Sequence, residues 1–223
     1  MKKTFALLTL AAAALLTPGR PAHAEPNFLG ATGQLLTPSA ATVGDRRIGA
    51  HAFFHDDFQN YGILGGITDR FELGLNYFNP DRGSGDFLLN AKLALLRETT
   101  LIPGISVGVI DAFSELDRDA SWYLVASKGF PDFLPVLGGA RVHFGYGGGI
   151  YDNEIFAAVE LGLGTPLDLI PVPQLRPSFS FLAEYMNNDV HLGIRGRWRG
   201  FAATVGLFDF DDFGGGVSYT ARF

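Results

Sequence analysis

Charged residues recur in this sequence inside short runs of otherwise apolar, extended character. Glu72 lies between Phe71 and Leu73, and Arg195 lies between Ile194 and a glycine. Carboxylate and guanidinium groups that share one enclosure can form ion pairs, or can hydrogen-bond a hydroxylated solute that passes between them. Eight such residues are candidates for one interior site, either as a salt-bridged filling or as the lining of a narrow path: Glu72, Lys92, Arg141, His143, Glu160, Glu184, Arg195 and Arg197.

Serine and histidine residues on the same runs offer a different chemistry, the hydrolysis or transfer of lipid acyl chains. Ser127 and Ser180 are the available nucleophiles, and His143 and His191 the available bases. A serine hydrolase of the common type places its nucleophile in a G-x-S-x-G turn, which this sequence lacks. We therefore expect no enzyme, with a lipid-modifying enzyme as the second alternative function.

Metal and cofactor sites find little support. The chain has no cysteine, which excludes zinc and iron–sulfur centres built on thiolates. The glycine run at 147–149 opens no helical pattern and does not predict a phosphate cradle. Two acidic connections lack the spacing of a calcium-binding loop, so we expect no metal and no cofactor: Asp117 with Asp119, and Asp209 with Asp211 and Asp212.

The elements that must position the charged residues alternate with a period of two. Between residues 71 and 78, for example, every second side chain is Phe, Leu or Tyr, and the others are Glu, Gly and Asn. This period is that of a β-strand with one apolar and one polar face. Twelve candidate strands follow: 46–54, 61–68, 71–78, 87–96, 105–113, 122–129, 139–146, 155–163, 177–185, 190–198, 201–208 and 214–223.

Three features favour an antiparallel up-and-down transmembrane β-barrel over a soluble sandwich. Twelve is an even number, as single-chain bacterial barrels require. Glycines on the polar faces predict a crowded interior: Gly74, Gly108, Gly145, Gly162, Gly193 and Gly206. Aromatic residues at the ends of strands predict girdles at the two membrane interfaces: Phe53, Phe54, Tyr77, Phe78, Tyr185, Trp198 and Phe208.

The chain begins as an exported protein does. Lys2 and Lys3 precede an apolar run at 5–16, and Ala22-His23-Ala24 is a cleavage pattern. This predicts a signal peptide over 1–24, an irregular segment over 25–44 that lies against or inside the main body, and a barrel domain over 45–223. Removing the leader leaves 14 basic residues against 23 acidic ones, a net charge of −9 that argues against nucleic acid as a partner.

The connections between strands alternate along the chain between acidic and charge-balanced. Counting from the first, the odd connections hold thirteen acidic residues and two basic ones, Arg82 and Arg118, whereas the even connections hold four of each. Such alternation is expected if odd connections lie at one end of the barrel and even connections at the other. With both chain ends in the periplasm, the acidic end faces outside.

The last ten residues, 214–223, alternate Val217, Tyr219, Ala221 and Phe223 with small or polar residues. A barrel must pair its last strand with its first, because no open edge survives in lipid. An aromatic last residue, Phe223, with Tyr219 four positions before it, resembles the insertion signal of bacterial outer-membrane barrels. The resemblance implies the barrel-assembly machinery as a partner and predicts that deletion of Phe223 impairs assembly more than a substitution in the lumen.

Several short motifs resemble those of the YjbH-like family of outer-membrane β-barrels, which is associated with exopolysaccharide and capsule loci. They are PNFLGATGQLLTPSA at 26–40, GISVGVID at 104–111, YLVASK at 123–128, LAEY at 182–185 and LGIR at 192–195. The chain would be a short, single-barrel form. The resemblance implies a cell outer-membrane location and an accessory role in exopolysaccharide export or envelope organisation, with a small-solute channel as the alternative. Implied partners are outer-membrane lipids, lipopolysaccharide, and polysaccharide or polysaccharide-export proteins.

Overall fold

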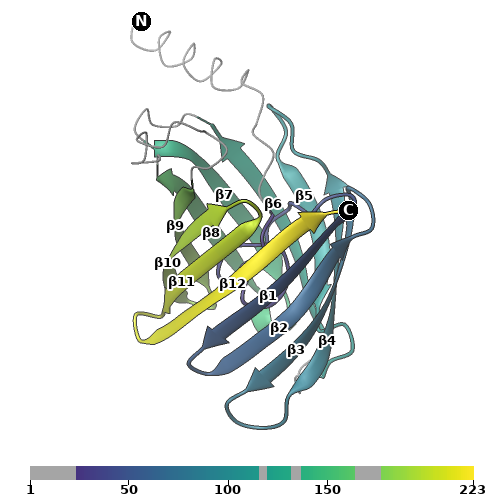
Figure 1. Ribbon diagram of the computed structural model, residues 1–223, viewed down its shortest axis with the longest axis vertical. Helices are drawn as coiled ribbons and strands as arrows, with labels where there is room; N and C mark the ends of the chain where they lie inside the picture. Colours follow the sequence, from purple (N-terminus) through teal and green to yellow (C-terminus); the bar gives the residue numbers. More distant parts are fainter. Residues whose placement is uncertain (1–23, 116–119, 132–136, 164–176) are drawn as a thin grey trace, which may run out of the picture.

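A computed structural model describes residues 24–115, 120–131, 137–163 and 177–223. Within them the chain forms one closed antiparallel barrel, shown in Figure 1. A single turn of 3-10 helix, Gly149–Tyr151, follows the seventh strand. The twelve strands are β1 Arg47–His55, β2 Phe58–Gly66, β3 Phe71–Pro80, β4 Asp86–Leu96, β5 Gly104–Ile110, β6 Ser121–Phe130, β7 Leu137–Gly147, β8 Glu154–Leu163, β9 Ser178–Met186, β10 Asp189–Trp198, β11 Phe201–Phe208 and β12 Asp212–Arg222.

Each strand pairs with its neighbour in sequence, and β12 closes the barrel on β1, with Arg47 opposite Arg222 and His55 opposite Gly214. The predicted fold and number of strands are therefore confirmed. The fifth strand ends at Ile110 rather than at residue 113, because Asp111 and Ser114 adopt the left-handed backbone conformation that starts a turn. No helix among the described residues is long and apolar enough to cross a membrane.

The outward face of the barrel is apolar. Leu75, Ile194, Val205 and Val217 each expose more than two fifths of their surface. A continuous exposed belt of this kind is what the hydrocarbon core of a bilayer requires, and a water-soluble surface does not carry it. The architecture is that of outer-membrane barrels.

The predicted aromatic girdle is partly wrong. Phe54, Tyr77, Tyr185 and Trp198 do face outward. Phe53 and Phe208 are buried in the interior and Phe78 is half-buried against it. Two adjacent strand residues cannot both face lipid, because consecutive side chains point to opposite faces; the pairs at 53–54 and 77–78 are therefore divided between the two faces.

The connections lie at the two ends of the barrel as their alternation predicted, since the strands simply run up and down. We call the end at the β1–β2 and β11–β12 connections the acidic end; the other carries the start of β1 and the end of β12 (Figure 1). Asn187 and Asn188 form a two-residue hairpin with positive φ at both positions, the conformation that type I′ turns require. Some predictions fall outside the described residues: the leader at 1–23, and Asp117, Arg118, Asp119, Asp132, Asp168 and Arg176.

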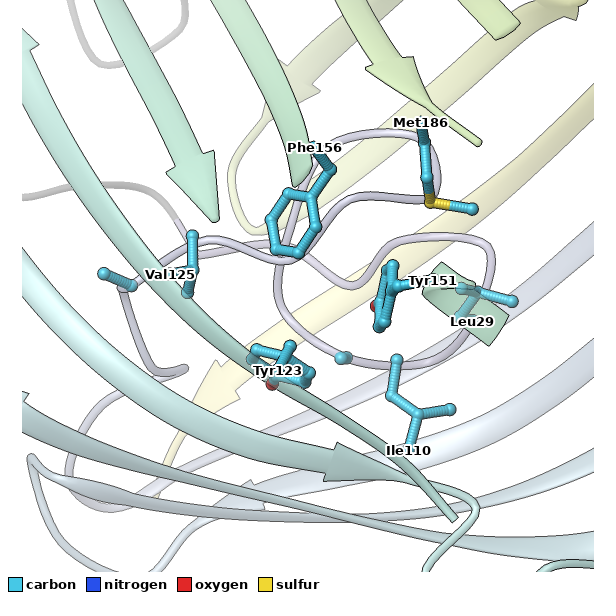
Figure 2. Packing of buried hydrophobic residues seen from close by; sticks show 9 residues of the cluster. Leu29, Ile110, Tyr123, Val125, Tyr151, Phe156 and Met186 are labelled. Carbon is cyan, nitrogen blue, oxygen red and sulfur yellow. The ribbon is translucent and has the colours of Figure 1, made fainter. Parts of the chain in front are cut away.

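Residues 24–45, which we call the N-terminal segment, run inside the barrel (Figure 1). The Asn27 side chain organises their first turn: its Oδ1 accepts the backbone N–H groups of Leu29 and Ala31, and its Nδ2 donates to the Leu36 carbonyl. Leu29 packs with Tyr151 and other wall residues in one apolar cluster, seen in Figure 2. Phe28, in a second cluster, is buried among rings of β1 and β11.

Candidate functional site

The eight predicted interior residues all point into the lumen. Glu72, Lys92, His143, Glu184 and Arg195 are each at most 3% exposed. The side chains of the remaining three, Arg141, Glu160 and Arg197, are exposed by 10 to 17%. Period-two alternation thus placed every one of them on the correct face. What it did not reveal is their partner, because most of them bind the N-terminal segment.

Glu184 on β9 holds one stretch of that segment. Its carboxylate accepts hydrogen bonds from three consecutive backbone N–H groups, those of Leu35, Leu36 and Thr37, at 2.7 to 3.2 Å. The Thr37 hydroxyl donates a fourth at 2.8 Å. Hydrogen bonds to an ionised acceptor are about twice as strong as neutral ones. The chain therefore turns around this single buried carboxylate.

Arg195 on β10 holds the preceding residues through their carbonyl groups. Its Nη1 donates to the Gly33 carbonyl at 2.9 Å and its Nη2 to the Gln34 carbonyl. Its Nε donates to Thr204 Oγ1 on the neighbouring strand at 2.9 Å, which fixes the plane of the guanidinium group. Glu184 and Arg195 thus satisfy donors and acceptors of one continuous stretch, residues 33–37.

On the other side of the lumen, Glu72 on β3 and Lys92 on β4 are a cross-strand pair, with Nζ and Oε1 3.8 Å apart. Glu72 accepts the backbone N–H of Val43 at 2.7 Å and that of Thr32 at 3.2 Å. Lys92 donates to the carbonyls of Thr32 at 2.7 Å and Ala41 at 3.2 Å. The pair clamps the two ends of a loop, residues 32–43.

Three further candidates form a chain of contacts through Gln34. Arg197 donates to Glu160 at 2.8 Å and lies 3.0 Å from the Glu25 carboxylate. Gln34 Nε2 lies 3.2 Å from Glu160 Oε2 and 2.8 Å from His143 Nε2. Arg141 stands apart from this site: it pairs with Glu98, at 2.6 Å, at the end of the barrel opposite the acidic end.

The two serine–histidine pairs considered for hydrolysis behave differently. Ser127 Oγ lies 2.7 Å from His143 Nδ1 and accepts the backbone N–H of Ala40 at 2.7 Å. The pair is buried under the N-terminal segment and anchors it. Ser180 accepts a hydrogen bond from Arg197, whereas the Nδ1 atom of His191 accepts the Asp209 backbone N–H, so this second pair is not joined.

Several buried polar atoms around the N-terminal segment have no hydrogen-bond partner among the described residues. The hydroxyl oxygens of Tyr123 and Tyr151 are of this kind. His51 on β1, by contrast, has side-chain hydrogen bonds with Asn60 on β2 and Asn76 on β3. A buried unpaired polar group costs about 1–3 kcal/mol. Groups of this type suit a lumen that contains water.

Sequence reasoning left open whether the N-terminal segment fills the lumen, and it did not identify the contacts that hold the segment there. Its hydroxyl and amide groups supply the contacts: Thr32, Gln34 and Thr37 are all at most 3% exposed. A Pro- and Gly-rich stretch with several such residues indicates only an irregular conformation. Its contacts with Glu184 span 147 to 149 positions, a separation that no local pattern encodes.

Comparison with known proteins adds the fold class. No family model matches the chain, and no curated protein matches it in sequence. A solved structure titled "KdgM porin in complex with disordered oligogalacturonate" superposes with a TM-score of 0.51 at 10% identity, over 79% of this chain and 99% of that one. A second, titled "KdgM porin", gives 0.50 at 11% identity, over 78% and 98%. At such identity the likeness shows the shared fold, a closed outer-membrane-type β-barrel.

Proposed function

We propose that the protein is an outer-membrane solute channel whose pathway is closed by its own N-terminal segment. One observation carries the proposal: the charged groups of the lumen bind mainly the backbone of that segment rather than each other. Glu184 makes all four of its recorded hydrogen bonds to residues 35–37. A filling that served only to make the barrel rigid would pair the wall charges with one another.

The unpartnered hydroxyl oxygens of Tyr123 and Tyr151, whose rings pack on Leu29, Ala31 and Ala40 of the segment, support the same proposal. In the closed barrel they lie against the segment without hydrogen bonds. Withdrawal of the segment would let water reach them, which offsets part of the cost of breaking the anchoring contacts. The closed state is therefore less favourable than its list of hydrogen bonds alone implies.

The similarity to porins supports a channel more than an accessory role, but the solute of the other protein does not transfer. Oligogalacturonate is a polyanion. The lumen here carries Glu72, Glu160 and Glu184 beside Lys92, Arg195 and Arg197, a balanced set. A balanced lumen does not concentrate anions in the way that a basic one does.

Planar-bilayer conductance tests the channel. The chain lacking residues 26–43 retains Glu25 after the predicted cleavage site and all twelve strands. We expect it to give stable conductance steps, whereas the full-length protein stays near the baseline. A synthetic peptide of residues 25–44 should close the open variant, because its contacts are with the barrel wall. A deleted barrel that shows the heat-dependent gel shift of a folded barrel but passes no ions would refute the channel.

The accessory role implied by the YjbH-like resemblance stays a prediction, as does the outer-membrane insertion role of Phe223 and Tyr219. Deletion of the gene should reduce extracellular polysaccharide if the role applies. Unchanged polysaccharide in the deletion strain, together with conductance of the open variant, would leave the channel as the function.

A further inference from the structure

Five aromatic side chains form a continuous row across the acidic end of the lumen. Phe78 stacks on Phe58 with ring centroids 4.8 Å apart, and Phe58 stacks on His55 at 4.7 Å. His55 meets Phe208 edge-on at 4.6 Å, and Phe208 lies 5.4 Å from His191. Strands β3, β2, β1, β11 and β10 each supply one ring, so the row is a property of the wall and not of one loop.

Strand β12 separates β1 from β11 and makes room for the row. It presents Gly214 at the lumen, where an added Cβ would lie 2.8 Å from both Phe208 and Phe28. The rings can meet across this strand because it has no side chain there. Phe28 of the N-terminal segment packs at 4.6 Å on Phe53 and 5.1 Å on Phe208, so the row borders the closing segment.

The two histidines of the row are fixed in one tautomer by the connections. His55 Nδ1 accepts the Asp57 backbone N–H at 3.0 Å, and His191 Nδ1 accepts that of Asp209 at 3.2 Å. In the neutral ring the proton is then on Nε2, which is a donor. Neither Nε2 atom has a hydrogen-bond partner among the described residues. His191 is 6% exposed and the His55 side chain 7%, so each can donate only to an acceptor that enters the row.

Carboxylates surround the row in the connections that end these strands. The connections are bonded to one another: the Phe213 N–H donates to Asp56 Oδ2 at 2.7 Å, and the Asp81 N–H to the Asp57 carbonyl at 2.8 Å. Concentrated negative charge repels an anionic solute. The exposed or half-exposed acids of these connections are Asp56, Asp57, Asp81, Asp209, Asp211 and Asp212.

From these contacts we infer that the aromatic row is a binding site for neutral, hydroxylated saccharides. A pyranose ring has a face of C–H groups that packs on the electron-rich face of an aromatic ring, and hydroxyl groups that accept from the imidazole N–H and donate to carboxylates. Both faces of Phe58 are covered, by His55 and by Phe78. The half-buried Phe78, at the end of the row, is therefore the ring that a sugar can reach first. The inference rests on the proposed channel and names the solute class that enters it.

Direct binding to the full-length protein in detergent tests this site without reference to conductance. Calorimetric titration with maltohexaose and with hexagalacturonate compares a neutral and an anionic hexasaccharide of similar size. We expect maltohexaose to bind at least tenfold more tightly. Phe58→Ala should weaken the binding of maltohexaose about five- to tenfold, because Phe78 loses the ring that holds it in place. The matched control Phe54→Ala, which removes a ring from the lipid-facing side of β1, should leave binding unchanged.

A second variant covers the case in which Phe58→Ala does not fold. Asp57→Asn with Asp211→Asn changes two exposed side chains and should raise the affinity for hexagalacturonate while that for maltohexaose stays constant. No binding of maltohexaose, tighter binding of the uronate, or equal effects of Phe58→Ala and Phe54→Ala would overturn the site. If the open variant conducts while the full-length protein binds neither sugar, the site fails and the channel stands. If maltohexaose binds but the open variant does not conduct, the channel fails and the site stands.

Discussion

Ile194 and Arg195 are adjacent on β10, yet one exposes 47% of its surface to the outside of the barrel and the other 1% to the inside. Thr204 and Val205 on β11 are divided in the same way. The outer side chains form an apolar belt, to which any apolar side chain of similar size can contribute. The inner ones form directed hydrogen bonds: Arg195 donates to the Gly33 and Gln34 carbonyls of the N-terminal segment, and Thr204 accepts from Arg195.

This difference shows which interactions stabilise each face of the barrel. The outer face depends on apolar area, which is additive and tolerant of exchange. The inner face depends on buried charges, and removal of one partner leaves the other unpaired in a medium of low dielectric constant. Equivalent substitutions on the two faces should therefore differ widely in effect, and the following experiments measure how widely.

Arg195→Met should show the largest difference. It removes the donors to Gly33, Gln34 and Thr204, and we expect a loss of about 3–5 kcal/mol in the free energy of unfolding. The control Ile194→Met, one residue away on the lipid face, should cost less than about 1.5 kcal/mol. Urea unfolding in detergent, followed by the loss of strand signal in circular dichroism, measures both. Equal losses of unfolding free energy in the two variants would mean that the contacts between Arg195 and the N-terminal segment do not stabilise the barrel.

Glu184→Gln keeps the shape of the side chain but removes its charge. One of its two acceptor atoms becomes an amide NH₂ that faces backbone donors, so we expect a loss of about 2–3 kcal/mol. Glu115→Gln, in an exposed connection, is the matched control and should be close to neutral. The conductance of the Glu184→Gln protein should also rise toward that of the open variant. A closed and fully stable Glu184→Gln protein would contradict the anchoring role.

These contrasts also explain which features were predictable. The outward face of β12, with Val217 and Tyr219 exposed by 57% and 44%, follows from period-two alternation alone. Closure on β1 follows from the rule that a sheet in lipid leaves no open edge. The inward position of Phe53 was missed because adjacent aromatics were assigned to one girdle. Consecutive strand residues point to opposite faces, so one ring of each adjacent pair must point into the barrel.

The N-terminal segment was less predictable for a different reason. Its conformation is set by Asn27 and by contacts with Glu72, Lys92, Glu184 and Arg195. No segment of the sequence alone contains both partners, so a single sequence indicates charges in the lumen without saying what they bind. The acidic and balanced connections, by contrast, were separable from order alone, because an up-and-down topology sends them to opposite ends.

Two glycines of β2 give a smaller test. A Cβ at Gly62 would lie 2.1 Å from Asn76 Oδ1 and 2.8 Å from His51 Cε1, whereas one at Gly65 would meet nothing within 4 Å. Since Asn76 is fully buried, Gly62→Ala should cost about 1–2 kcal/mol. Gly65→Ala should be neutral, or stabilising by a few tenths of a kcal/mol, because alanine restricts the unfolded chain. The urea midpoints of both variants test this prediction. A destabilised Gly65→Ala barrel would contradict the open space beside Gly65.

The smallest effect is expected outside both faces, at the turn between β2 and β3. Arg97 donates to Asp69 at 2.6 Å, and this hydrogen bond holds the pKa of the Asp69 carboxyl below its usual value. A lowered folded-state pKa stabilises the protein above the unfolded-state value, and the contribution is lost as the pH falls through the folded-state value. Asp69→Asn should therefore lower the urea midpoint slightly at pH 7 and not at all once the carboxyl is protonated in both states. Arg97→Gln should reproduce the loss, and the double variant should add nothing to it. Because the pair is solvent-exposed and screened, a loss as large as that of Arg195→Met would mean that burial does not distinguish the lumen charges from those at the ends of the barrel.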